Sequence, residues 1–180
     1  MGASGGRPAS GPGLSLIVRG RDDPVFGWRY WQLSSRRLLR SVTQREVEWP
    51  PGRVLRALCV EVGHPAPAER CNCGRYANPA LEALRQHGLC LAPEAIVLGQ
   101  VALWGKVVDD EPSYRAEFAY PARLSLVVDS LVDDTPPETL LEGLSAYGVP
   151  VLTITLDEAV AGMSADMLKF QAMSRRTSGP

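Results

Sequence analysis

The chain has 180 residues, of which 45% are hydrophobic and 22% are charged, with a formal net charge of −1 at pH 7. These values suit one globular domain and exclude a disordered or fibrous chain. No apolar run reaches the ~18–20 residues that a membrane-spanning helix needs, and residues 1–13 lack the apolar centre of an export signal. We therefore expect no membrane partner and a cytoplasmic location, where disulfides are rare.

The charge is unevenly distributed along the chain. Residues 1–56 contain ten arginines against four acidic residues, a local net charge of +6, which leaves −7 for the rest of a chain whose total is −1. A basic segment of this kind is suited to an acidic protein partner or to nucleic acid. It is equally suited to attracting the acidic half of its own fold.

The N-terminal part of the chain predicts a tail followed by strands. Residues 1–13 are mostly Gly, Pro, Ser and Ala and are expected to be disordered. Residues 14–18 and 25–33 are rich in apolar and aromatic side chains, which predicts two strands separated by a charged turn. Residues 34–42 fit either a short helix or another strand. One globular domain is expected over 14–173, with a second tail at 174–180.

The next segments predict a strand and a helix around a cysteine-rich loop. Residues 53–60 follow a Trp-Pro-Pro-Gly turn and alternate loosely, which predicts a strand that ends near Cys59. A helix is expected to begin at Asn78 and Pro79, because Asn is a good N-cap and Pro fits the first turn. Gly88 is expected to end this helix.

A β-hairpin is the clearest element of the second half. Residues 96–109 and 114–120 are strand-like and are separated by a short acidic turn. Gly99 and Gly105 predict bulges or sharp bends in the first strand. Pro121 is expected to end the second strand, and residues 122–128 to form another. Arg115 and Glu117 are interpreted as charges on a solvated face of the hairpin.

The C-terminal part predicts a strand–helix–strand unit. Thr135 and Glu138 fit a capping box, with Pro136 at the first helical position and Gly148 as the stop. Residues 149–154 predict a strand that pairs in parallel with the strand beginning at Leu124. A last helix is expected over 164–173. The predicted fold is α+β: a bent, mainly antiparallel sheet or small barrel, with about three peripheral helices.

The chemistry of the sequence is concentrated between residues 59 and 90, which contain all four cysteines and both histidines. Thiolate sulfur and imidazole nitrogen are the ligands that structural Zn²⁺ prefers. One candidate set is Cys59, His64, Cys71 and Cys73. The alternative set keeps the Cys-x-Cys pair and completes it with His87 and Cys90.

Two other interpretations of these cysteines remain open. Free cysteine is often buried, so Cys59 and Cys90 also fit plain core positions. A thiol-dependent enzyme would use Cys71 or Cys73 as nucleophile, since Arg70 and Arg75 flank the pair and a cation lowers a thiol pKa.

A nucleic-acid interface is the alternative suggested by the basic N-terminal half. Aromatic rings interleaved with arginines can stack on bases. The candidate residues are Trp28, Arg29, Tyr30, Trp31, Arg36 and Arg37. The competing interpretation is that these aromatic side chains pack in the core.

Three strings of the chain, over residues 71–77, 99–108 and 115–121, are similar to those of short bacterial proteins from high-GC genomes, a resemblance that implies no activity. No P-loop, dinucleotide-binding glycine pattern, GxSxG or HExxH motif occurs. We therefore expect a non-enzymatic binding or regulatory protein with a structural zinc site.

Overall fold

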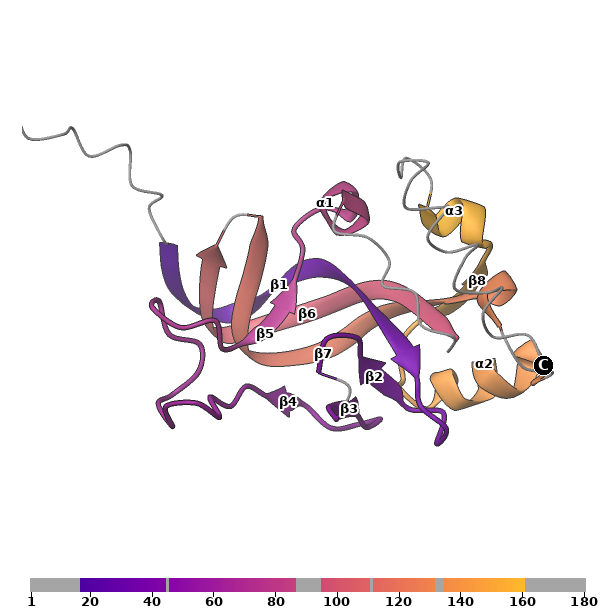
Figure 1. The fold of residues 1–180 in the computed structure, drawn as a ribbon, viewed down its shortest axis with the longest axis horizontal. Coiled ribbons are helices and arrows are strands. Elements are labelled where there is room, and N and C mark those ends of the chain that lie inside the picture. The colour runs from indigo at the N-terminus through magenta and orange to yellow at the C-terminus, as the bar shows by residue number, and fades with distance from the viewer. Residues whose placement is uncertain (1–16, 45, 87–94, 111, 132–134, 161–180) are drawn as a thin grey trace, which may run out of the picture.

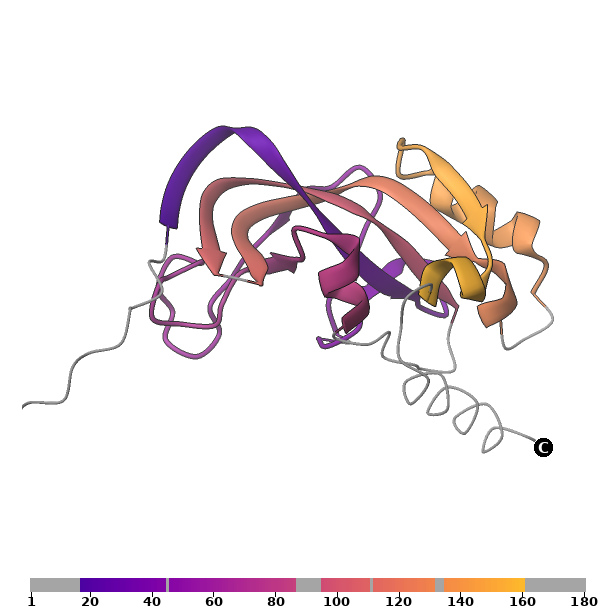
Figure 2. The same ribbon diagram turned by 90° about the horizontal axis from the view of Figure 1, so that it is seen from above.

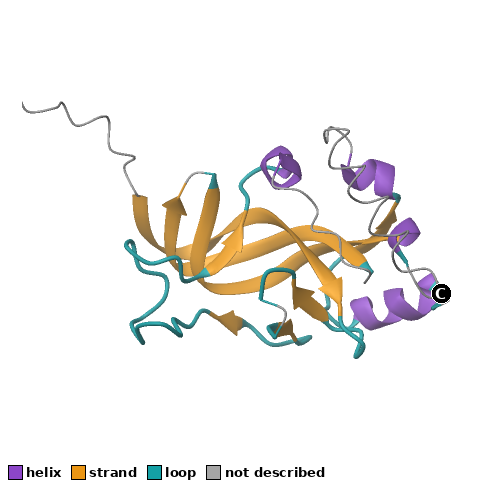
Figure 3. Ribbon diagram, in the orientation of Figure 1, coloured by secondary structure: helices purple, strands orange, loops and turns teal. Residues whose placement is uncertain are grey.

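The computed structural model describes residues 17–44, 46–86, 95–110, 112–131 and 135–160. Within these residues the fold is α+β, with a mostly antiparallel sheet of eight strands and three α-helices (Figures 1 and 3). No helix in the described part of the chain is long and apolar enough to cross a bilayer.

Three long strands form the spine of the sheet: β1 (Ile17–Leu33), β6 (Ile96–Asp110) and β7 (Ser113–Val127). All three are strongly curved, as the view in Figure 2 shows. The predicted charged turn at residues 19–24 is wrong, because β1 runs through it with only a register shift between Arg21 and Val25. Hydrogen bonds to β6 on both sides of this shift hold the segment extended. Residues 14–16 lie outside the described part.

The hairpin of β6 and β7 is confirmed, including its bends. Register shifts fall between Gln100 and Val101 and between Trp104 and Val107, beside the two predicted glycines. Gly105 adopts φ of 73°, a conformation that favours glycine. Pro121 does not end the strand, because it lies opposite the first shift, where a residue without a backbone donor is tolerated. The two strands predicted for 114–120 and 122–128 are therefore one.

Short strands flank the spine on both sides. β2 (Leu39–Ser41) and β3 (Glu48–Trp49) extend the sheet beyond β1. β4 (Leu55–Arg56) and β5 (Arg75–Ala77) both pair with β7. The strand predicted over 53–60 shrinks to β4, so Cys59 belongs to the loop that follows. β5 was not predicted, because its three residues carry no strand pattern of their own.

The sheet is open, which settles the choice between an open sheet and a barrel. Asn78, just after β5, forms an isolated bridge to Trp28 of β1, and its backbone exchanges two hydrogen bonds with that residue. The ladder does not continue beyond this bridge. Because Asn78 is held by Trp28, α1 (Leu81–Gln86) begins three residues after Asn78 rather than at Pro79.

The C-terminal elements cover one end of the sheet (Figure 1). A 3₁₀ turn (Val128–Ser130) leads to α2 (Pro137–Ser145), whose N-cap is Pro136 and not, as predicted, its first helical residue. Gly148 has φ of 67° after this helix. β8 (Val151–Ile154) pairs in parallel with the end of β7 and leads to α3 (Leu156–Val160). Gly88 and the helix expected over 164–173 lie outside the described residues.

The main hydrophobic core lies between the spine, the short strands and α2. Trp31 and Trp49 meet edge to face at 5.5 Å between ring centroids, and both are almost completely buried. Leu103, Leu124 and Leu144 complete the centre of this cluster. A smaller cluster on the other side of the sheet contains Leu84, Ile96, Leu98, Val127 and Ala159, with Trp28 and Tyr30 packed against it.

Candidate metal centre

The first predicted ligand set lies together in the loop that connects β4 to β5. The ligand atoms of Cys59, His64, Cys71 and Cys73 all lie within 4.8 Å of one another, and each residue is partly buried. The cluster is anchored at both ends by strands on β7, because β4 precedes Cys59 and β5 follows Cys73. Sequence spacing alone gave no reason to prefer this set over the alternative one.

The distances within the cluster suit a tetrahedral ion. The sulfur atoms of Cys59 and Cys71 are 3.8 Å apart. Two thiolates at about 2.3 Å from a tetrahedral Zn²⁺ lie about 3.8 Å from each other. The three cysteines Cys59, Cys71 and Cys73 are free thiols, so a disulfide does not explain their proximity.

Backbone hydrogen bonds favour the thiolate form of Cys59. The backbone N–H of Val62 donates to it, followed in importance by that of Glu61, and these bonds outweigh partial burial. They lower the pKa of Cys59 to about 7. Backbone N–H groups that surround a sulfur in this way stabilise its negative charge, which is the form that binds metal.

His64 and Cys71 differ from Cys59 in what their neighbours do to the candidate ligand atom. The Nδ1 atom of His64 lies 3.0 Å from the carbonyl oxygen of Pro65. Because a carbonyl only accepts, this contact fits the tautomer with the proton on Nδ1, which leaves Nε2 as the candidate ligand atom. At Cys71 the backbone N–H of Cys73 lowers the pKa, but burial and the neighbouring sulfurs outweigh it and the pKa is raised. A cation among these sulfurs would reverse that effect.

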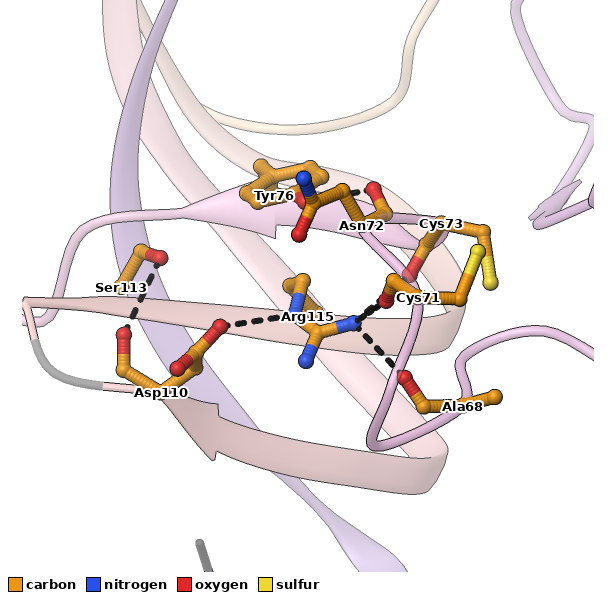
Figure 4. A network of polar contacts seen from close by, with 8 residues as sticks. All are labelled: Ala68, Cys71, Asn72, Cys73, Tyr76, Asp110, Ser113 and Arg115. Atoms are coloured by element: carbon orange, nitrogen blue, oxygen red, sulfur yellow. Dashed lines mark hydrogen bonds and ion pairs between the residues drawn. The ribbon is translucent and has the colours of Figure 1, made fainter. Parts of the chain in front are cut away.

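Arg115 lies in an environment that its position in the sequence does not predict. The sequence predicts a solvated charge, yet Arg115 is 1% exposed and its guanidinium contacts the backbone of the cysteine loop, residues 57–74 (Figure 4). Alternation along a strand does not reveal this, because the neighbouring Ala116 is buried as well. No local sequence signal marks an arginine whose environment is supplied by a loop more than 40 residues away.

The structure bears only in part on the alternative ligand set and on the thiol-enzyme interpretation. His87 and Cys90 lie outside the described residues, so the alternative ligand set stays a prediction. For a thiol enzyme, the lowered pKa belongs to Cys59, which was not the expected nucleophile, and the pKa of Cys71 is raised.

The six residues of the nucleic-acid interpretation do not form one surface. Trp31 is fully buried in the main core, whereas Trp28 and Tyr30 pack against the smaller cluster on the other side of the sheet. Arg36 is exposed and forms an ion pair with Glu48, and Arg37 is exposed at a positive φ of 59°.

Arg29 is used inside the fold. Its two terminal nitrogens donate to the carbonyl oxygen of Tyr76 at 2.7 Å and to the Ser41 hydroxyl at 3.1 Å, and its guanidinium lies 5.0 Å from the Trp49 ring centroid. Burial lowers its pKa to about 10, so it stays charged at neutral pH. In addition, Arg56 pairs with Glu117 at 3.2 Å, which joins the basic and acidic parts of the chain.

Comparisons of the chain with protein-family models, with curated proteins and with solved structures find no match. The chemistry of the site therefore rests on its own geometry. That geometry offers three sulfur ligands and one imidazole nitrogen to a single point, from one loop held at both ends by the sheet.

Proposed function

We propose that Cys59, His64, Cys71 and Cys73 bind one Zn²⁺ as a structural ion. The observation that carries the proposal is the mutual proximity of the four ligand atoms, all within 4.8 Å. Three thiolates and one imidazole form a ligand set in which Zn²⁺ takes its usual four-coordinate geometry. The soft sulfur ligands favour Zn²⁺ over Mg²⁺ or Ca²⁺, which prefer oxygen.

The proposed role of the ion is to fasten the loop between β4 and β5, and not to catalyse a reaction. Four protein ligands leave no open position for water or substrate, which is the arrangement of structural sites. The protein is accordingly proposed to be a non-enzymatic binding or regulatory protein. Fixing the loop gives a defined shape to a segment that exposes Leu58, Val60 and Val62 to solvent.

Metal analysis of the purified full-length chain tests this proposal. We expect close to one Zn²⁺ per chain, and a Co²⁺-substituted protein with the visible bands of a tetrahedral site and a strong near-ultraviolet thiolate band. C59S and C71S should lose the ion. C90S is the matched control, because it removes a cysteine that belongs only to the alternative set.

The outcomes separate the three interpretations. Loss of Zn²⁺ in C71S but not in C90S supports the proposed set, whereas loss in C90S and retention in C59S favours the set with His87 and Cys90. If the wild-type chain binds neither Zn²⁺ nor Co²⁺, the proposal fails. Rapid alkylation of one cysteine near neutral pH in that metal-free chain would then favour a thiol enzyme.

A further inference from the structure

The segment Cys71–Cys73 lies against a pair of side chains that the sheet itself aligns. Tyr76 of β5 and Arg115 of β7 are directly opposite each other in the antiparallel register. Residues in such a pair project from the same face of the sheet. Both side chains donate hydrogen bonds to carbonyl oxygens of the cysteine loop, Tyr76 through its hydroxyl and Arg115 through its guanidinium.

The Arg115 guanidinium binds three carbonyl oxygens of the loop through one nitrogen. Nη1 donates to Ala68 at 3.0 Å, to Cys73 at 3.2 Å, and to Cys71. The opposite side of the guanidinium is held in turn, because Nε donates to Asp110 Oδ2 at 3.1 Å. Figure 4 shows the loop curving around this group, with the Cys71 and Cys73 sulfurs on the side away from it.

Tyr76 holds the peptide group between Asn72 and Cys73. Its hydroxyl donates to the carbonyl oxygen of Asn72, and the N–H of the same peptide group, that of Cys73, donates to the Cys71 sulfur. In a trans peptide the C=O and N–H bonds point in opposite directions. Fixing the carbonyl on Tyr76 therefore directs the N–H at the sulfur that binds metal.

Gly74 brings the loop close enough for these contacts. Its φ is 139°, and a Cβ there would lie 3.0 Å from the Cβ of Arg115 and 3.3 Å from that of Pro67. The backbone thus passes directly over the base of the arginine side chain, in a conformation that a residue with a Cβ rarely adopts.

We propose that Arg115 and Tyr76 are positioning residues for the metal centre: they form a template that orients the Cys71 and Cys73 sulfurs before the ion binds. The inference rests on the proposed function. Three thiolates and one Zn²⁺ carry a net charge of −1, so a buried guanidinium behind the loop also stabilises the loaded site. Lysine keeps that charge and its single nitrogen has three donors, but it lacks the Nε donor through which Asp110 holds the group in place.

The test measures Zn²⁺ affinity by chelator competition in R115M, R115K and Y76F. We expect R115M to lose about 10- to 100-fold, as partners that orient ligands usually do. R115K should recover part of that loss, and Y76F should lose about 3- to 10-fold because it removes one hydrogen bond. R123M is the matched control, since Arg123 is exposed on the same strand.

A second readout separates positioning from general stability. The visible spectrum of the Co²⁺ protein should change in R115M and Y76F, because the sulfurs meet the ion at altered angles, while circular dichroism of the sheet stays unchanged. Wild-type affinity and an unchanged spectrum in both variants would overturn the inference. If R115M does not fold, Y76F and R115K still decide it.

The template is also testable if the wild-type chain binds no metal. Arg70 is an exposed trypsin site within the loop. In the metal-free protein, R115M should be cut there faster than both wild type and R123M. Faster cutting supports the template even though the proposed function has failed, whereas equal cutting in all three proteins would overturn the template as well.

Discussion

The sheet core and the cysteine loop, residues 57–74, are ordered by different forces. The core buries large apolar side chains completely, among them Trp31, Leu103 and Leu124. The loop buries only small ones such as Ala57 and Ala66, and it exposes Leu58, Val60 and Val62. It is held instead by the polar contacts of Arg115 and Tyr76 and, as proposed, by an ion.

This difference matters because a packed apolar core and a loop held by hydrogen bonds are sensitive to different substitutions. Burial is proportional to area and has no strict direction, so the core depends on volume. Hydrogen bonds and metal ligands depend on the position of single atoms. The core should therefore be sensitive to lost methyl groups, and the loop to lost donors, ligands and backbone conformations.

The largest effect is expected from Leu103→Ala in the main core. Leu103 is 0% exposed, so the substitution removes buried apolar contacts and leaves a cavity. We expect a loss of about 2–5 kcal/mol in the free energy of unfolding, measured by urea titration. Leu152→Ala, at a half-exposed position of β8, is the control and should cost far less. Equal losses in the two variants would contradict a single apolar core at this position.

Tyr147→Phe should come next, because it breaks a polar contact inside the core. The Tyr147 hydroxyl accepts from the Leu39 N–H at 2.9 Å and donates to the Trp49 carbonyl, so it bridges β2 and β3. Its removal leaves two buried backbone groups without this partner, which costs about 1–3 kcal/mol. Urea unfolding at pH 7 measures this loss.

The same tyrosine predicts a pH dependence. Burial raises the pKa of Tyr147 to about 12, above its ordinary value of about 10. The native state therefore keeps a proton that the unfolded state releases, and this contribution is complete below pH 10 and is lost as the pH rises toward 12. The stability difference between wild type and Tyr147→Phe should shrink over that range. A constant difference from pH 9 to pH 11.5 would show that the hydroxyl is not buried as described.

Gly74→Ala separates the loop from the core, because it strains the backbone of the loop and leaves the core side chains unchanged. The new Cβ would meet Arg115 at 3.0 Å in a backbone of φ 139°. The loop can relieve that strain by opening locally. The free energy of unfolding should therefore fall by only about 1 kcal/mol, while trypsin cuts faster at Arg70. Gly52→Ala is the control, because Gly52 also has positive φ but no atom within 4 Å of an added Cβ. Faster cutting at Arg70 in both variants would rule out the close approach as the cause.

The smallest effect is expected from Val60→Ser at the surface of the loop. Val60 is 92% exposed and contributes little to packing. The free energy of unfolding should change by no more than about 0.5 kcal/mol, and Zn²⁺ affinity should stay at the wild-type value. A large loss in either measurement would mean that the loop has an apolar core of its own.

Some features followed from the sequence because their causes are local. The β6–β7 hairpin was predicted from two strand-like segments around an acidic turn, and its bends were predicted from two glycines. The proximity of Cys59, His64, Cys71 and Cys73 was predicted because cysteine and histidine are few and lie close together in the chain. The α+β class followed from the alternation of strand and helix patterns.

Tertiary structure alone decided the features that depend on distant partners. β1 continues through a charged segment because β6 pairs with it, and Pro121 is tolerated because a register shift lies opposite. Trp31 is buried against Trp49 of β3, a distant partner along the chain. Arg29 is engaged by Tyr76 of β5 and Ser41 of β2. Arg115 is buried because a loop more than 40 residues away in sequence supplies the acceptors for its charge. The sequence by itself determined that six candidate ligands lie close together in the chain. Only the pairing of β4 and β5 with β7 decided that Cys59, His64, Cys71 and Cys73 meet, because the position of a loop depends on where both of its ends are fixed.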